Sequence, residues 1–185
     1  MKLSTSLLLA SGSLVALLNG SCLPKEKNNH GPIPIAKGGF QNVVAHADMG
    51  FYAFSFGAPK TYAYQSFQVK LKEAAWLSIT DGFCPGDTFQ VFDNGVPLAV
   101  TILPTDANLD CVTAYDENAW NCFVGPNHAK RTVFLNPGHH NLTITSITGP
   151  YGGGTGFIRL DTSCTPVGQQ PVPCCWIVDA ENLNE

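Results

Sequence analysis

The sequence has few charged side chains and no excess of basic ones. Only 13% of its 185 residues are Asp, Glu, Lys or Arg, and the formal net charge is −4. Proteins that bind nucleic acid or an anionic membrane surface usually carry a basic patch, because they must neutralise phosphate groups. The composition therefore argues against nucleic acid as a partner.

Recognisable catalytic motifs are also missing from the sequence. It contains no G-x-S-x-G elbow and no H-E-x-x-H pair, and the glycine-rich segment 149–156 lacks the Lys followed by Ser or Thr that a phosphate-binding loop requires. His139 and His140 are neighbours on an expected strand, so their side chains should point to opposite faces. We therefore expect a protein that is not an enzyme.

Long hydrophobic runs are absent except at the N-terminus. Lys2 precedes an apolar stretch at residues 7–18, and Leu18 and Gly20 suit the −3 and −1 positions of a cleavage site. This pattern predicts a signal peptide over residues 1–20, a secreted extracellular product and no membrane span after cleavage.

Seven cysteines are consistent with an oxidising compartment. Their spacing predicts a disulfide between Cys111 and Cys122, which would close a short loop. It also predicts a bond from Cys164 to Cys174 or Cys175. One thiol is left over, to be free or to form an intermolecular bridge.

The most informative stretch is residues 76–102, where three runs alternate between apolar and polar residues. Period-two alternation is typical of strands with one buried face. Pro85-Gly86 and Asn94-Gly95 separate the runs, and Asn-Gly is a strong hairpin signal because both residues tolerate positive φ. The stretch predicts three adjacent antiparallel strands.

Further strand-like runs occur on both sides of this stretch. Phe67, Val69 and Leu71 alternate with polar residues, which predicts one face in the core and one in water. No segment has a convincing helical period, although residues 104–130 form a long turn-rich loop with a possible helical turn near residues 116–120. We predict an all-β fold, an antiparallel two-sheet sandwich or jelly roll with one long disulfide-closed loop.

The domain organisation follows from the same patterns. After the signal peptide, residues 21–39 are polar and rich in Gly and Pro, which predicts a flexible N-terminal arm. The β-sandwich domain should cover residues 40–164. Residues 165–185 form a C-terminal tail that contains Pro and Cys.

Three segments carry a resemblance to known proteins: TDGFCPGDTFQVFDNG, LNPGHHNLTI and GGGTGFIRLD. Over roughly residues 71–164 they resemble uncharacterised small secreted proteins of fungi, with a GDxFxVFDNG motif, and some bacterial exported proteins. This resemblance implies a fold but no activity. The chain is more loosely similar to extracellular CUB modules at Cys84, Asp87, Gly95 and Gly156-Phe157, although its cysteine arrangement departs from theirs.

Carboxylates at the ends of two expected strands suggest a cation site. Asp81 ends one strand and Asp87 begins the next, and Asp116 or Glu117 in the long loop could complete a calcium shell. No other cofactor is indicated. Alternatively, Asp81 accepts backbone hydrogen bonds in its turn. A carboxylate pair for glycoside hydrolysis could be drawn from the same residues, but nothing in the sequence sets its separation.

Asn141 begins an Asn-Leu-Thr sequon in a chain that should enter the secretory pathway. If this asparagine carries a glycan, its side chain faces solvent. Leu142 and Ile144 then lie on the inner face of the sheet, which agrees with the hydrophobic pattern.

The loop at residues 111–122 is the predicted ligand site. It combines aromatic rings that could stack on a sugar with amides that could bond hydroxyl groups, and the residues concerned are Tyr115, Trp120, Asn118 and Asn121. An equally weighted alternative is that Trp120 packs inward as a plug over the core. Two functions follow from this site: binding of carbohydrate or cell wall, or an effector or protease-inhibitor-like role toward an extracellular protein.

Overall fold

The structure is a computed structural model. It describes the backbone of residues 22–24, 40–166 and 172–173, and the side chains of residues 40–162. The predicted signal peptide, most of the predicted arm and the Cys164 bridge to Cys174 or Cys175 lie outside the part that is described. Within the predicted arm, Cys22–Pro24 forms strand β1.

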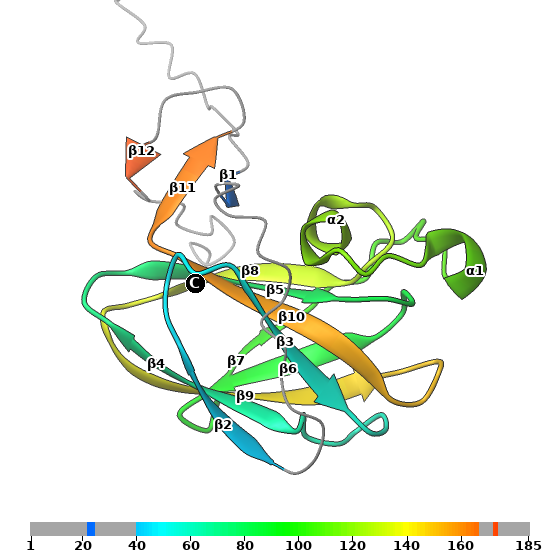
Figure 1. Cartoon of the computed structure of the whole chain (residues 1–185), viewed down its shortest axis with the longest axis horizontal. Coiled ribbons are helices and arrows are strands. Elements are labelled where there is room, and N and C mark those ends of the chain that lie inside the picture. Colours follow the sequence, from blue (N-terminus) through cyan, green and yellow to red (C-terminus); the bar gives the residue numbers. More distant parts are fainter. Residues whose placement is uncertain (1–21, 25–39, 167–171, 174–185) are drawn as a thin grey trace, which may run out of the picture.

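Two packed sheets form the body of the protein (Figure 1), and this confirms the predicted all-β sandwich. One sheet has four strands in the order β3-β10-β5-β8, and the other has five in the order β2-β4-β9-β6-β7. Their bounds are β2 Gln41–Ala45, β3 Phe51–Phe56, β4 Gln65–Leu71, β5 Ala75–Asp81, β6 Thr88–Asp93, β7 Val96–Val100, β8 Lys130–Leu135, β9 Gly138–Thr148 and β10 Gly154–Asp161.

Strand pairing is antiparallel throughout both sheets except between β2 and β4, which are parallel. A small separate sheet joins β1 to β11 (Ser163–Pro166) and β11 to β12 (Val172–Pro173). None of the helices in the described ranges is long and apolar enough to cross a membrane.

The core lies between the two sheets and contains the inward-facing apolar side chains of both. Phe54 and Phe89 come from opposite sheets and meet edge to face, with ring centroids 4.9 Å apart. Phe67, Val69 and Leu71 are buried while Gln68 and Lys70 are exposed, as the period-two pattern predicts. The rings and branched chains interlock across the layers and so fix the two sheets to each other.

The Asn94-Gly95 prediction is confirmed. Both residues have positive φ, 50° and 80°, and β6 and β7 pair on either side of them. Positive φ at both central positions is what a type I′ hairpin turn requires.

The prediction of three adjacent strands is wrong at Pro85-Gly86. Strand β5 belongs to the four-stranded sheet and β6 to the five-stranded sheet, so this corner crosses from one layer to the other. Alternation reports that one face of a strand is buried, and two strands facing the same core from opposite layers show the same pattern.

Candidate functional site

Residues 104–130, between β7 and β8, form a cap that contains two short helices, α1 (Cys111–Ala114) and α2 (Ala119–Val124). Each helix begins at an N-cap residue whose side chain accepts backbone hydrogen bonds. The carboxylate of Asp110 accepts the Val112 N–H, and the amide oxygen of Asn118 accepts the N–H groups of Trp120 and Asn121. Such caps satisfy the amides that a helix leaves without internal partners. Asn118 is therefore used structurally.

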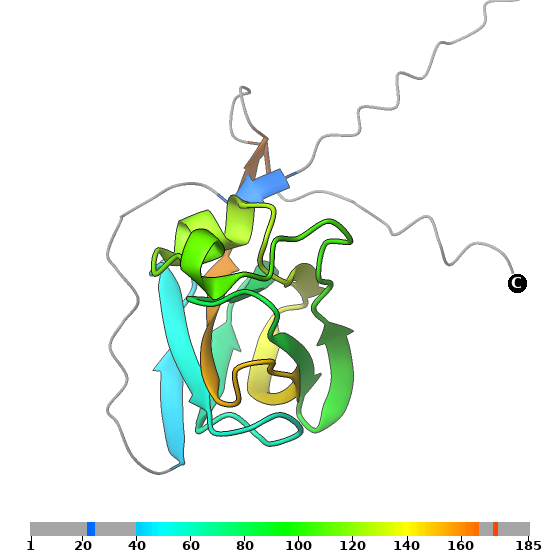
Figure 2. The same cartoon turned by 90° about the vertical axis from the view of Figure 1, so that its right-hand side faces the viewer.

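Helix α2 packs on the outer face of the four-stranded sheet, and Figures 1 and 2 both place the helices on this side of the sandwich. A second cluster of buried side chains lies here, in which Phe51 and Phe157 of the sheet pack against Ala119, Cys122 and Phe123 of the helix. The rings of Phe51 and Phe123 lie 6.2 Å apart. This second, smaller core anchors the cap to the sheet.

The cap is also held by a disulfide, between Cys84 and Cys111, with Cα atoms 4.7 Å apart. The predicted bond between Cys111 and Cys122 is wrong. Cys122 is fully buried in the smaller core as a free thiol, and it donates a hydrogen bond to the Asp116 carbonyl. Burial raises the pKa of this thiol to about 12, with the charge of Asp116 adding to the effect, so Cys122 stays protonated and unreactive.

Close backbone pairing brings the disulfide partners together. Phe83 and Asp116 exchange both backbone hydrogen bonds, at 2.8 and 3.0 Å, which sets the segment before Cys84 beside the cap. Spacing along the chain gave no sign of this long-range pair. Cys84 and Cys111 are 27 positions apart in the sequence, whereas the two cysteines of the predicted pair are 11 positions apart.

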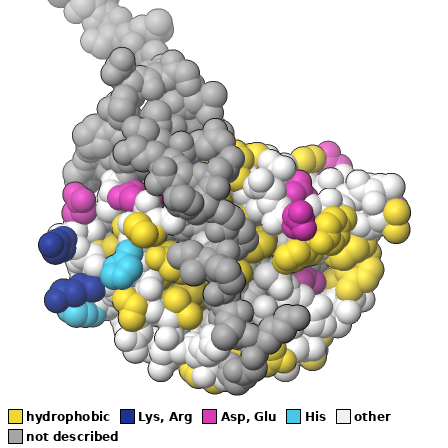
Figure 3. All heavy atoms as spheres, viewed as in Figure 1, with side chains coloured by type: hydrophobic (Ala, Val, Ile, Leu, Met, Phe, Trp, Pro, Cys, Tyr) yellow, Lys and Arg dark blue, Asp and Glu magenta, His cyan; other side chains and the backbone are white. Residues whose placement is uncertain are grey.

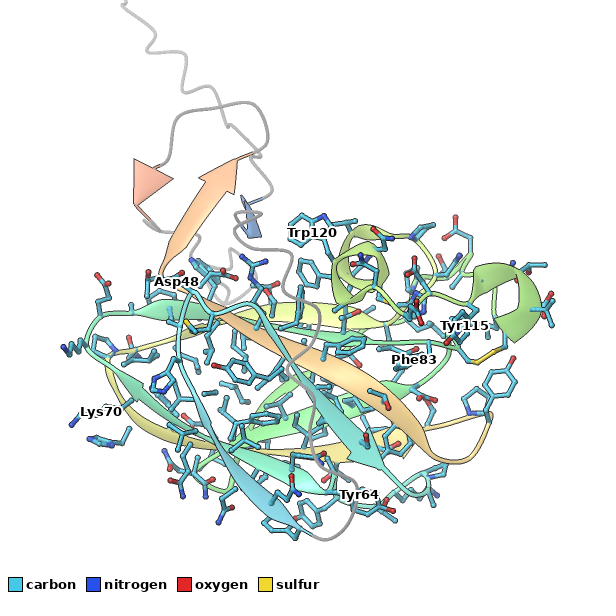
Figure 4. The ribbon with its side chains drawn as sticks, in the orientation of Figure 1. Asp48, Tyr64, Lys70, Phe83, Tyr115 and Trp120 are labelled. Atoms are coloured by element: carbon cyan, nitrogen blue, oxygen red, sulfur yellow. A yellow bond between two sulfur atoms is a disulfide. The ribbon has the colours of Figure 1, made fainter. Side chains whose placement is uncertain are left out.

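Tyr115 is the most prominent aromatic ring of the cap. It is 52% exposed and rests against Phe83, with ring centroids 5.8 Å apart and planes tilted by 54°. Phe83 in turn contacts the buried ring of Phe157 at 6.0 Å. Figure 4 shows Phe83 and Tyr115 close together at one end of the molecule. Tyr115 is thus in contact with Phe83 on one side, while much of its ring is open to solvent.

Tyr151 lies in the turn between β9 and β10 and contacts the chain next to Cys111. Its hydroxyl group donates to the Leu109 carbonyl at 2.7 Å and accepts the Cys111 N–H at 3.3 Å. We call Phe83, Leu109, Val112, Tyr115 and Tyr151 the cap patch, since all but the half-buried Phe83 are exposed. Phe83 and Tyr151 could not be predicted from local patterns, because their roles depend on contacts between distant segments.

Trp120 occupies a different place from Tyr115. It is only partly buried and packs against the smaller core, 6.3 Å from Phe123, while the Arg159 guanidinium lies 5.7 Å from its ring centre. In Figure 4 it lies on the opposite side of α2 from Tyr115. The four residues of the predicted site are therefore divided: Trp120 packs on the sheet, Asn118 caps a helix, and Tyr115 and Asn121 remain exposed.

We expect Trp120→Ala to lower the free energy of unfolding by about 2 kcal/mol. Removing the ring opens the edge of the smaller core and takes away the cation–π contact with Arg159. Denaturant unfolding monitored by circular dichroism measures this loss. Asn121→Ala, an exposed change one position away, is the matched control and should have little effect. Equal stability of the two variants would show that Trp120 is not part of the packing.

The predicted cation ligands are only partly brought together. Asp81 and Asp87 lie at the same corner. The Asp81 carboxylate, however, accepts hydrogen bonds from three backbone N–H groups, those of Gly82, Gly86 and Asp87, at 2.7, 2.9 and 3.1 Å. The Asp116 carboxylate instead accepts the Asn118 N–H at 2.8 Å. Within the described residues no three His, Cys, Asp or Glu side chains form a metal-binding group. Calcium binding stays a prediction.

Both carboxyl groups at this corner have strongly raised pKa values. Burial, together with the charge of Asp87, raises the pKa of Asp81 to about 8, and the three backbone hydrogen bonds oppose the shift. Burial raises the pKa of Asp87 to about 7. Two adjacent buried carboxylates repel each other, so near neutral pH the pair retains protons that separate, exposed groups would release.

Asn141 faces solvent from the middle of β9, and Leu142 and Ile144 are buried, as the sequon argument predicts for this strand. Glycosylation itself stays a prediction. The expectation for the two histidines is confirmed: His139 is exposed, while His140 turns to the other face and pairs with Asp93 at 2.8 Å.

The fold and the cap together define a disulfide-linked β-sandwich whose long loop is folded onto one sheet. No known protein family matches the chain, and no curated protein does. Among solved structures, it is similar to the pre-peptidase C-terminal domain of a collagenase from Bacillus anthracis, with 12% identity and a TM-score of 0.40, over 68% of this chain and 100% of that one.

A second similar structure is a β-glucosidase from Paenibacillus barengoltzii, with 14% identity and a TM-score of 0.32. The match covers 71% of this chain and 12% of the β-glucosidase. At these values neither likeness carries information about activity or ligand, and the function must be argued from the site.

Proposed function

We propose that the protein is a secreted, non-catalytic module that binds polysaccharide through the cap patch. The observation that carries the proposal is the Tyr115 ring, which is half exposed and held in contact with Phe83. Sugars bind to such rings by laying their apolar face on the aromatic surface, while neighbouring polar groups bond the hydroxyls. Glu117 and Asn121 follow Tyr115 in the chain and have exposed side chains, and we infer that they supply those bonds.

Preorganisation of the cap supports this proposal. The Cys84–Cys111 disulfide, the Phe83–Asp116 backbone pair and the Tyr151 hydroxyl all hold the patch in place before any ligand arrives. A surface that is already ordered loses less conformational entropy on binding. The disulfide also supports an extracellular location, because such bonds persist in oxidising compartments. The deep burial of Asp81 and Asp87 supports a non-catalytic role.

Replacement of Tyr115 by Ala tests the function. We expect at least a tenfold loss of affinity for the polysaccharide that the parent protein binds, with little change in melting temperature, because the ring is half exposed. Binding is measured with insoluble cellulose, chitin and β-1,3-glucan. Tyr62→Ala, which removes an exposed tyrosine that lies between β3 and β4 and is bridged to Thr145 of β9, is the control. If the parent protein binds none of these polymers, or both variants bind equally well, the proposal is wrong.

A second candidate function is binding to an extracellular protein. It is favoured by Val112, which is 89% exposed at the start of α1 beside the disulfide. An apolar side chain on a rigid, cross-linked projection suits insertion into a partner's cleft, as in protease inhibitors. A panel of secreted proteases assayed with the parent protein and with Val112→Ser would reveal this role, since the variant should lose inhibition that Tyr115→Ala retains in part.

A further inference from the structure

The outer surface of the five-stranded sheet contains a depression of about 350 Å³, distant from the cap patch. Strands β2, β4 and β9 provide most of its lining, and the side chains used below are Val44, His46, Gln68, Lys70, His139 and Asn141. Figure 4 places Lys70 at one end of the long axis and Tyr115 near the other. Figure 3 shows Lys or Arg and His side chains at that same edge, next to Asp or Glu side chains.

The register of the sheet explains why basic and amide groups meet here. Lys70 lies directly opposite His139, and Gln68 directly opposite Asn141. Residues that are opposite on neighbouring strands point to the same face with Cβ atoms about 5 Å apart. Residues that alternate with them along the strands, such as Val69, point to the inner face and belong to the core. These four side chains therefore project outward together.

The depression is basic although the protein as a whole is acidic. Among the described residues that line it, none is Asp or Glu. The lining residue His140 is paired through Nδ1 with the Asp93 carboxylate at 2.8 Å, while its Nε2 faces the Asn136 carbonyl at 2.9 Å. An ammonium group and imidazoles beside amides form a set of hydrogen-bond donors suited to an anionic oxygen group.

We propose that this depression is a second binding site, for the carboxylate or sulfate groups of an acidic polysaccharide. Lys70 and His139 bind the anionic oxygens, Gln68 and Asn141 bond neighbouring hydroxyl groups, and the exposed Val44 contacts the apolar face of a sugar ring. The proposal extends polysaccharide binding to a second surface, and it uses none of the residues of the cap patch.

Asn141 is also the acceptor of the sequon, and a glycan attached to it would lie over the depression. The test therefore uses the full chain carrying Thr143→Ala, which removes the sequon but keeps Asn141. Polygalacturonate supplies carboxylate groups, dextran sulfate supplies sulfate groups, and neutral dextran is the uncharged reference. Affinities are measured by calorimetry at 150 mM salt, where weak long-range attraction is largely screened.

In this background we expect Lys70→Gln and His139→Gln each to weaken binding of at least one acidic polymer tenfold or more. Lys72→Gln is the matched control: it removes the same charge from an exposed lysine two residues away, which does not line the depression. We expect it to change affinity less than twofold. Tyr115→Ala should bind the acidic polymer as well as its parent does, so failure of the cap patch would not affect this result.

Binding of polygalacturonate alone assigns carboxylate as the preferred group, and binding of dextran sulfate alone assigns sulfate. Either of these outcomes supports the site. Three outcomes would overturn it. These are no binding of either acidic polymer, equal binding of neutral dextran, and equal losses in Lys70→Gln and Lys72→Gln, which would indicate general attraction to positive charge.

Discussion

Replacing Cys84 and Cys111 together by serine should lower the free energy of unfolding by about 3.5 kcal/mol. The bond closes a loop of 27 residues, and a cross-link of that length removes this much chain entropy from the unfolded state. Denaturant unfolding of the double variant against the oxidised parent measures the loss. Far-ultraviolet circular dichroism should still show a β-sandwich, because the main core lies between the sheets and does not include the bridge.

Cys122→Ala is the control that separates the observed bond from the one that spacing predicted. With Cys84 bonded to Cys111, this variant keeps the bridge and loses only the contacts of one small buried side chain, about 1 kcal/mol. Peptide mapping without reduction should recover the segments containing Cys84 and Cys111 as one linked species. A large loss in Cys122→Ala, with a linked peptide containing Cys122, would contradict the structure of the cap.

The second large effect should appear in the dependence of stability on pH. Folding raises the pKa of Asp81 and Asp87 from 3.8 to about 8 and about 7. Between those limits the folded protein holds protons that the unfolded chain has released, so a rise in pH favours unfolding. The contribution of these two carboxyl groups to the free energy of unfolding is fully present below pH 3.8 and is lost above about pH 8. Each proton accounts for up to about 1.4 kcal/mol per pH unit.

We therefore expect the free energy of unfolding to fall between pH 5 and pH 8, and Asp87→Asn to make the decline distinctly shallower. The variant removes one of the two repelling carboxylates and keeps the side-chain size. Unfolding is measured in the presence of EDTA, so that no cation neutralises the pair. Asp106→Asn, in the exposed part of the cap, is the control. Parallel pH profiles for the parent and Asp87→Asn would show that the pair is not protonated in the fold.

Local patterns predicted local structure well. The Asn94-Gly95 hairpin and the inward face of β4 depend on neighbouring residues, and both were predicted correctly. The two helices have four and six residues, too few for a 3.6-residue period to be visible, so only a possible turn was foreseen. Asp81 and Asp87 were expected to be neighbours and are, but at a corner between layers instead of within a hairpin.

Features that depend on distant contacts could not be derived in this way. The Cys84–Cys111 bond follows from the backbone pairing of Phe83 with Asp116, and the support of Tyr115 follows from the same pairing. Trp120 and Tyr115 are five residues apart, and one of two equally weighted predictions placed them on one platform, the other having Trp120 packed inward. The capped turn of α2 directs them to different sides, so only Tyr115 is left for stacking.

We propose that the cap presents a rigid aromatic surface to a sugar chain. Backbone amide NMR spectra of the full chain, recorded during titration with cellohexaose, chitohexaose and laminarihexaose, test this proposal. With at least one of them, we predict saturable shifts concentrated at Phe83, residues 109–121 and Tyr151, with few changes in the five-stranded sheet. Shifts confined to other surfaces, or none with any of the three, would contradict the claim.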